Sequence, residues 1–133
     1  MKKIWIVRVI DIIYLIAICV LCFADFDSVH GVPREFFGIP TDKWIHFLMF
    51  LPYPLLAFFS FKPHETSVSR VLLLLLAVLA FGVLLAEATE IIQGYLPYRT
   101  KDEADLKSDC LGLVGGTFLT IIVLLLMPRK KNA

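Results

Sequence analysis

Four long apolar stretches make up most of the chain, and short polar stretches separate them. They predict helices at about residues 4–23, 44–61, 71–93 and 105–127. Each is close to the roughly 17–25 residues that a helix needs to cross a bilayer. A membrane-spanning strand would alternate polar and apolar residues, and these stretches do not, so the pattern favours helices. We therefore predict an all-α membrane protein, a four-transmembrane-helix bundle that forms a single domain over residues 1–133.

Composition supports this fold class. Hydrophobic residues make up 59% of the chain, and the mean hydropathy is +0.80. Soluble domains contain roughly 45–50% apolar residues, so a water-soluble core is the poorer explanation. The net charge of +1 is too small to indicate a nucleic-acid partner, and three cysteines do not form a disulfide framework. The expected surroundings are membrane lipids.

The first apolar stretch follows two lysines, as the apolar region of a secretory signal would. It is longer than the roughly 7–15 residues usual for such a region and contains two charges, so we interpret it as a retained helix. Those charges, Arg8 and Asp11, are three residues apart, a spacing at which opposite charges on a helix can pair. In the second stretch, Pro52 and Pro54 predict a kink.

Basic residues near the helix ends predict the orientation. One side of the membrane would carry Lys2, Lys3, Arg8, Lys62, Arg70, Arg129, Lys130 and Lys131, and the other Arg34, Lys43, Arg99, Lys101 and Lys107. Because basic residues favour the cytoplasmic side, this bias predicts that both termini are inside. The longer loop between the first two helices, at about residues 24–41, would then be outside, and we expect it to lie along the membrane surface.

Ionisable residues gather where the helices meet that outer side. The candidate ligand-binding residues are Asp42, Lys43, His46, Glu87, Glu90, Gln93, Arg99, Asp105 and Asp109. Ionisable groups near hydrocarbon are costly and usually functional, so this grouping predicts a site. Glu87 and Glu90 are three apart near the end of the third helix, so they should face inward and be paired with cations, and Arg99 is the predicted partner of Glu90. On the fourth helix, Gly112 and Gly116 share a face with the two aspartates and predict close packing against a neighbouring helix.

These residues resemble the motifs of the VanZ-like membrane protein family. The similarity comprises Asp42-Lys43-x-x-His46-Phe47, Glu90-x-x-Gln93, Pro97-x-Arg99, and Asp105 followed by Asp109-x-x-Gly112-x-x-x-Gly116. Tyr98 stands where the family often has glycine, and Asp109 where it often has asparagine. The resemblance implies a multi-pass protein of the bacterial cytoplasmic membrane, and the family's namesake is associated with resistance to teicoplanin. It implies functional roles for the quoted motif residues. We add Glu87 to them because of its predicted depth in the membrane.

Three functions are compatible with this pattern. The first, which we prefer, is binding without catalysis of an amphiphilic cell-envelope ligand, a lipid-linked cell-wall precursor or a lipoglycopeptide such as teicoplanin. The second is an intramembrane enzyme acting on a lipid headgroup, with His46 and either Glu87 or Glu90 as acid and base. The third is a small transport or partner subunit that forms a homodimer through Gly112 and Gly116. We expect no cofactor and no metal, because the possible ligands show no recognised metal-binding spacing.

Overall fold

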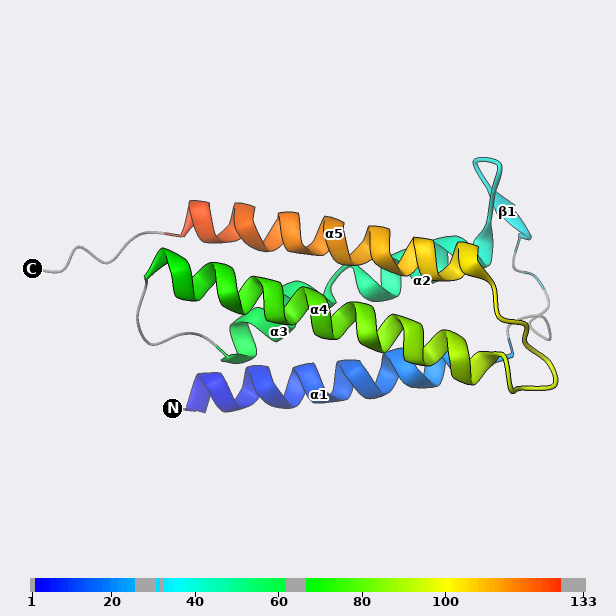
Figure 1. The fold of residues 1–133 in the computed structure, drawn as a ribbon, viewed down its shortest axis with the longest axis horizontal. Helices are drawn as coiled ribbons and strands as arrows, with labels where there is room; N and C mark the ends of the chain where they lie inside the picture. Colours follow the sequence, from blue (N-terminus) through cyan, green and yellow to red (C-terminus); the bar gives the residue numbers. More distant parts are fainter. Residues whose placement is uncertain (1, 26–30, 32, 62–66, 128–133) are drawn as a thin grey trace, which may run out of the picture.

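The computed structural model of the 133-residue chain describes residues 2–25, 31, 33–61 and 67–127. Its elements are α1 (Lys2–Phe23), β1 (Glu35–Phe36), β2 (Ile39–Pro40), α2 (Thr41–Phe50), α3 (Tyr53–Phe61), α4 (Val68–Gln93) and α5 (Glu103–Leu126). The helices run side by side along one axis (Figure 1). Successive membrane-length segments run antiparallel. The end of α1, the start of α2, the end of α4 and the start of α5 therefore meet at one end of the bundle, which we call the polar end.

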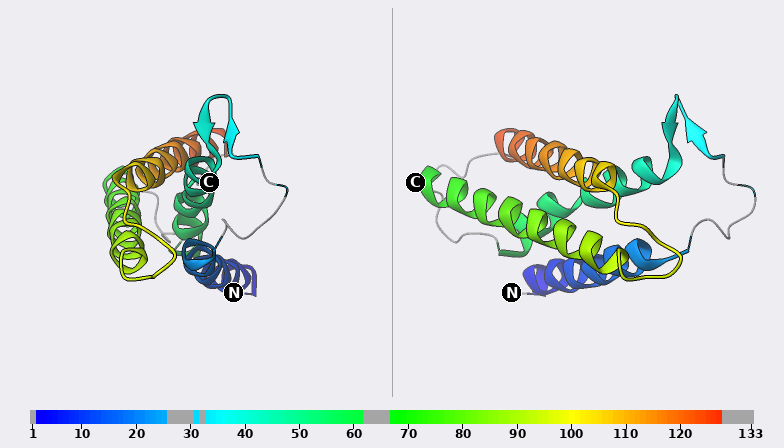
Figure 2. Two further views of the ribbon diagram at one scale, coloured as in Figure 1. Left: turned by 90° about the vertical axis from the view of Figure 1, so that its right-hand side faces the viewer. Right: turned by 45° about the vertical axis from the view of Figure 1, so that its right-hand side comes forward.

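The prediction of a mostly helical chain with four membrane-length helices is confirmed. By length and composition, the segments Lys3–Phe23, Thr41–Phe61, Val68–Gln93 and Glu103–Leu126 could each cross a bilayer. The second and third helices begin about three residues earlier than predicted, because polar residues extend each helix beyond its apolar stretch. Figure 2 shows the four segments arranged around a shared centre when the bundle is viewed along its axis.

The second membrane-length segment is broken into α2 and α3 near its middle. Pro52 and Pro54 cannot donate the backbone hydrogen bonds that would continue α2, so the helix ends at Phe50 and restarts at Tyr53. The two halves then pack differently, since α2 lies mainly against α5, whereas α3 also contacts α1 and α4. The predicted kink is therefore a complete interruption of the helix.

Two glycines of α5 lie directly against this interruption. A Cβ atom added at Gly112 would collide with the carbonyl oxygen of Phe47, and one added at Gly116 would collide with that of Leu51. Only a residue without a side chain allows the backbones to approach this closely. The small-residue face of α5 is therefore occupied by α2 and α3 of the same chain, which leaves it unavailable for the predicted dimer contact.

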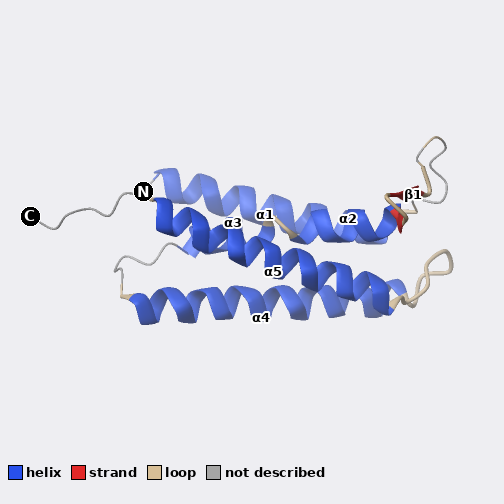
Figure 3. Ribbon diagram, turned by 90° about the horizontal axis from the view of Figure 1, so that it is seen from above, coloured by secondary structure: helices blue, strands red, loops and turns tan. Residues whose placement is uncertain are grey.

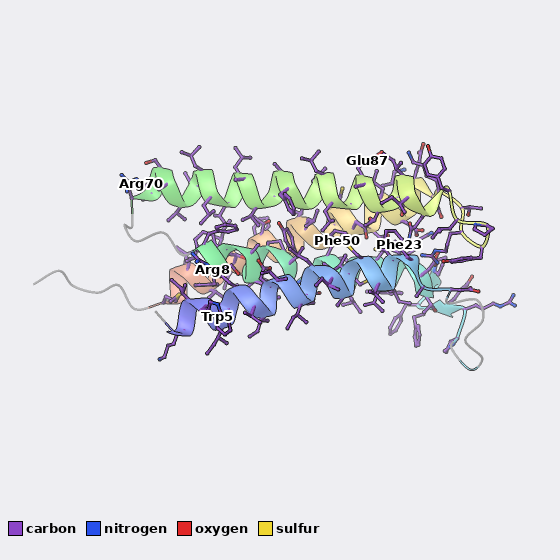
Figure 4. The ribbon with its side chains drawn as sticks, turned by 90° about the horizontal axis from the view of Figure 1, so that it is seen from below. Trp5, Arg8, Phe23, Phe50, Arg70 and Glu87 are labelled. Atoms are coloured by element: carbon purple, nitrogen blue, oxygen red, sulfur yellow. The ribbon has the colours of Figure 1, made fainter. Side chains whose placement is uncertain are left out.

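The interior of the bundle is narrow, and its outside is apolar. Phe50, Tyr53 and Leu113 are buried between the helices, whereas many large apolar side chains of α1, α4 and α5 are exposed. Phe50 lies between the ribbons in Figure 4, while Trp5 extends outward from the start of α1. An apolar outer surface around a packed interior is what a bundle surrounded by lipid requires.

Arg8 and Asp11 do not form an ion pair with each other, although their spacing would allow one. Arg8 Nε donates a hydrogen bond to the backbone carbonyl oxygen of Ser60, 3.0 Å away on α3. Asp11 is buried, with 7% of its surface exposed. Because Arg8 reaches a neighbouring helix, its contact joins α1 to α3 instead of neutralising a charge on its own helix.

A small hairpin projects from the polar end, where the sequence predicted a loop along the surface. β1 and β2 pair antiparallel, and the turn residues Phe37 and Gly38 have φ angles of 53° and 74°. Positive φ at both central residues is the geometry that tight hairpins favour. Trp44 Nε1 donates to the carbonyl oxygen of Phe36 (3.2 Å) and ties the hairpin to α2. Figure 3 shows the hairpin at the same end as the connection between α4 and α5.

Candidate functional site

The polar end contains a buried histidine held between two aspartates. His46 of α2 is 1% exposed, and its Nδ1 lies 2.9 Å from Oδ1 of Asp109 on α5. On the other side of the ring, His46 Nε2 lies 3.6 Å from Oδ2 of Asp105. The two aspartates are four residues apart, so they project from the same face of α5 and flank the imidazole.

Glu90 completes a group that we call the buried triad, His46, Glu90 and Asp109. Glu90 comes from α4 and is 0% exposed, as is Asp109. One ligand atom from each of the three residues lies within 4.8 Å of the other two. Three different helices therefore bring a nitrogen and two carboxylates together in the interior.

A second group, the lysine cluster, lies beside the triad and consists of Lys43, Asp42, Asp102 and Asp105. Lys43 Nζ donates to Asp42 (3.0 Å), to Asp102 (2.5 Å) and to Asp105 (2.5 Å). The Lys43 side chain is 14% exposed and that of Asp105 is 8% exposed, so this contact is shielded from water. Asp105 also connects the lysine cluster to the buried triad, because its other oxygen faces His46.

Asp102 is a member of the site that the sequence interpretation missed. It precedes α5, and its Oδ1 accepts a hydrogen bond from the backbone N–H of Ala104 (2.9 Å), as an N-cap residue does. The hydrogen bond from Lys43, followed by that from Ala104, lowers the pKa of the Asp102 carboxyl below its usual value. An aspartate just before a predicted helix is an N-cap signal, and it could have identified this residue.

The predicted pairing of Glu90 with Arg99 is wrong. Glu90 Oε2 accepts a hydrogen bond from the backbone N–H of Asp102 (3.1 Å). Arg99 Nη2 instead faces the carbonyl oxygen of Cys22 at 3.5 Å. The turn after α4 brings its backbone, and not the arginine side chain, over the glutamate.

Two of the predicted site residues, Gln93 and Arg99, contact the C-terminal end of α1. Gln93 is 1% exposed and donates from Nε2 to the Cys22 carbonyl oxygen (2.5 Å), which Arg99 also approaches. Tyr98 donates its hydroxyl hydrogen to the carbonyl oxygen of Phe23 (3.0 Å). The last carbonyls of a helix have no partner within the helix, so these side chains cap α1 and dock it to the end of α4 and to the loop that follows.

The prediction that Glu87 faces inward is wrong, because Glu87 lies apart from the buried triad. Its side chain is 41% exposed, and its Oε1 lies 3.5 Å from Lys101 Nζ. Figure 4 labels it on α4 toward the polar end, far from Arg8 and Arg70 at the opposite end. It helps to line an open groove of about 310 Å³, whose lining residues are Glu87, Lys101, Asp102, Glu103, Leu106 and Lys107.

Negative charge dominates the interior of the polar end. Five carboxylates lie in the two groups, and they belong to Asp42, Glu90, Asp102, Asp105 and Asp109. Within these groups, the cationic side chains are Lys43 and, when protonated, His46. The arrangement is suited to holding a cation, or to moving a proton between an imidazole and a carboxylate.

The fold and the site define a helical protein with four helices able to cross a membrane and a buried histidine–carboxylate group at one end. No family model, curated protein or solved structure matches the chain.

Proposed function

We propose that this protein is a VanZ-like multi-pass protein of the bacterial cytoplasmic membrane that binds an amphiphilic cell-envelope molecule without catalysis. In this proposal both termini lie in the cytoplasm and the polar end faces outward. The resemblance of the motifs supports the family and the location in the membrane. The bias of basic residues supports the orientation. The observation that carries the binding proposal is the groove between α4 and α5 together with the surface directly below it.

The groove combines both signs of charge at its mouth. Lys101 and Lys107 can contact phosphate or carboxylate groups, while Glu87 and Glu103 can accept hydrogen bonds from hydroxyl, amide or amino groups. Both lysines are exposed. A headgroup that carries an anion and hydrogen-bond donors, as cell-wall precursors do, would meet complementary groups here.

The surface changes from polar to apolar within one helical turn below the groove. Leu84 lies three residues before Glu87 on α4 and is 68% exposed. Leu111 lies four residues after Lys107 on α5 and is 63% exposed. Because residues three or four apart share a helix face, these leucines continue the two walls of the groove toward the membrane interior. An acyl or prenyl chain could lie along them while its head remains in the groove.

Binding measurements on purified protein in nanodiscs test this proposal. A lipid-linked cell-wall precursor or teicoplanin, added to wild type, should raise the thermal unfolding temperature, and the rise should grow with the logarithm of the ligand concentration once that exceeds Kd. Replacing both groove lysines, Lys101→Gln with Lys107→Gln, should weaken binding by roughly tenfold or more, equivalent to about 1.4 kcal/mol. Lys3→Gln at the opposite end is the matched control. Equal affinity of all three proteins, or no binding by wild type, would contradict the proposal.

One observation favours the enzymatic alternative. The 2.9 Å contact between His46 Nδ1 and Asp109 resembles the way that a carboxylate orients a catalytic imidazole, and His46 Nε2 has no hydrogen-bond partner within the described residues. Glu90, and not Glu87, lies beside this histidine. The burial of all three groups counts against direct contact with a substrate, so binding remains our preferred function. Release of a headgroup from a labelled lipid by wild type, but not by His46→Gln, would reverse this preference.

A further inference from the structure

We propose that the buried triad of His46, Glu90 and Asp109 binds one divalent metal ion that accepts mixed nitrogen and oxygen ligands, either Zn²⁺ or Mn²⁺. This inference concerns the interior of the bundle, whereas the proposed ligand lies in the groove outside it. The metal proposal therefore stands independently of the proposed function. It also replaces the expectation from the sequence that no metal site exists.

The three residues have the geometry of a ligand set. Their ligand atoms lie within 4.8 Å of one another, and the side chains are 0–1% exposed. Ligands bonded to one ion at about 2.0–2.2 Å are separated from each other by less than twice that length. Small side-chain adjustments would bring all three within bonding distance. Because the ligands come from α2, α4 and α5, the packing of three helices holds them in place.

Each member of the triad has an unsatisfied polar atom. His46 Nε2, Glu90 Oε1 and Asp109 Oδ2 are buried and have no hydrogen-bond partner within the described part of the chain. Buried polar atoms almost always have partners, because leaving one without any costs free energy. His46 Nε2 faces Asp105, outside the triad, whereas the two unsatisfied carboxylate oxygens belong to the triad itself. Two unsatisfied carboxylate oxygens beside an imidazole indicate that a cation binds there.

The charge around the triad points to a divalent ion. Lys43 is already bound to three aspartates of the lysine cluster, so its charge is not available to balance the triad. With His46 neutral, as a metal-binding histidine is, Glu90 and Asp109 would leave two negative charges in an interior that disfavours them. One divalent cation would compensate both.

The surroundings match those of a metal-bound histidine. Nδ1 of His46 faces Asp109, a member of the triad, and Nε2 faces Asp105, which lies outside it. When Nδ1 binds the ion, Nε2 is therefore left facing the carboxylate of Asp105. Glu90 is also oriented, because its Oε2 accepts the Asp102 backbone hydrogen bond while Oε1 has no partner. Metal-binding residues are commonly fixed in this way by a second layer of hydrogen bonds.

Another acidic group at the polar end does not carry the same inference. Asp42, Asp102 and Asp105 also present oxygens within 4.8 Å of one another. Each of them already contacts Lys43 Nζ, which occupies the position that an ion would take. We therefore place the ion at the buried triad and not in the adjacent lysine cluster.

Metal analysis of purified protein tests the proposal. Wild type in detergent is treated with a chelator, equilibrated with Zn²⁺ or Mn²⁺, freed of unbound ion, and analysed by mass spectrometry for metal content. We expect about one ion per chain and a higher unfolding temperature than that of the chelator-treated protein. Glu90→Gln and Asp109→Asn should each weaken binding by roughly tenfold or more. Glu87→Gln, on the same helix but outside the triad, should bind like wild type.

Either of two results would overturn the proposal, namely that wild type retains neither ion, or that Glu90→Gln and Asp109→Asn bind as well as wild type. If the variants do not fold, Co²⁺ added to wild type decides the matter. Binding to nitrogen and oxygen ligands gives visible absorption without the near-ultraviolet bands of a cobalt–thiolate bond. Thiolate bands would assign the ion to a cysteine, and the absence of any Co²⁺ spectrum would show that there is no site.

Discussion

His46 Nδ1 and Asp109 Oδ1 lie 2.9 Å apart, although 63 positions separate the two residues in the chain. Their contact depends on the close approach of α2 and α5. Gly112 and Gly116 follow Asp109 on the same face of α5 and lie against the backbone of Phe47 and Leu51. The glycines therefore set the separation of the two helices at the depth where the histidine meets the aspartate.

The first prediction concerns this close packing. Gly112→Leu and Gly116→Leu should destabilise the protein by at least the roughly 1–3 kcal/mol typical of overpacked interiors, because the new side chains would meet backbone atoms that cannot move aside. Thermal unfolding in detergent measures the effect. Val114→Leu adds volume at a position of α5 that is 49% exposed and serves as the control. Unfolding temperatures equal to wild type for both glycine variants would contradict the packing described here.

The second prediction concerns the lysine cluster. Lys43→Met should leave the nearly buried Asp105 without its cation. The loss of stability should lie between the roughly 0.2–1 kcal/mol of exposed ion pairs and the roughly 3–5 kcal/mol of buried ones, since Asp42 and Asp102 remain partly in water. Lys101→Met is the control, because its partner Glu87 is 41% exposed, and it should cost no more than about 1 kcal/mol. Equal losses of unfolding free energy for the two variants would show that burial of Lys43 has no special role.

The number of membrane-length helical segments, and the end of the bundle at which the candidate residues gather, could be predicted from the sequence. The length of the apolar stretches determines how many helices can cross a membrane, and antiparallel connection places the starts of α2 and α5 beside the end of α4. Thus His46, Glu90 and Asp109 were all among the predicted residues, and the structure brings them together.

The pairing of charges could not be predicted in the same way. The helix α4 is apolar on all sides, so its sequence does not show whether Glu87 or Glu90 turns inward. The structure buries Glu90 and leaves Glu87 at the groove. The path of the loop after α4 decides that Asp102, and not Arg99, reaches Glu90, and loop paths depend on tertiary contacts that have no periodic signal.

The third prediction concerns the docking of α1. Tyr98→Phe removes the hydroxyl that donates to the Phe23 carbonyl oxygen and should cost about 0.5–1.5 kcal/mol of stability, as the loss of one hydrogen bond does. Tyr95→Phe is the matched control, because Tyr95 is 84% exposed and close in sequence. Faster protease cleavage after α1 in Tyr98→Phe than in Tyr95→Phe would support the capping role. Identical cleavage rates and unfolding temperatures would rule it out.

The fourth prediction tests the orientation on which the proposed function depends. Ser67 precedes α4, and Thr100 lies in the connection between α4 and α5 at the polar end, and both are exposed. Single cysteines at these two positions, in a chain whose native cysteines have been replaced, should react differently with a membrane-impermeant maleimide in intact cells. The excess of basic residues on the Ser67 side predicts that Thr100→Cys is labelled from outside and that Ser67→Cys is labelled only after the membrane is permeabilised. The reverse pattern would turn the groove and the buried triad toward the cytoplasm, and an envelope ligand outside the cell could then not reach the groove.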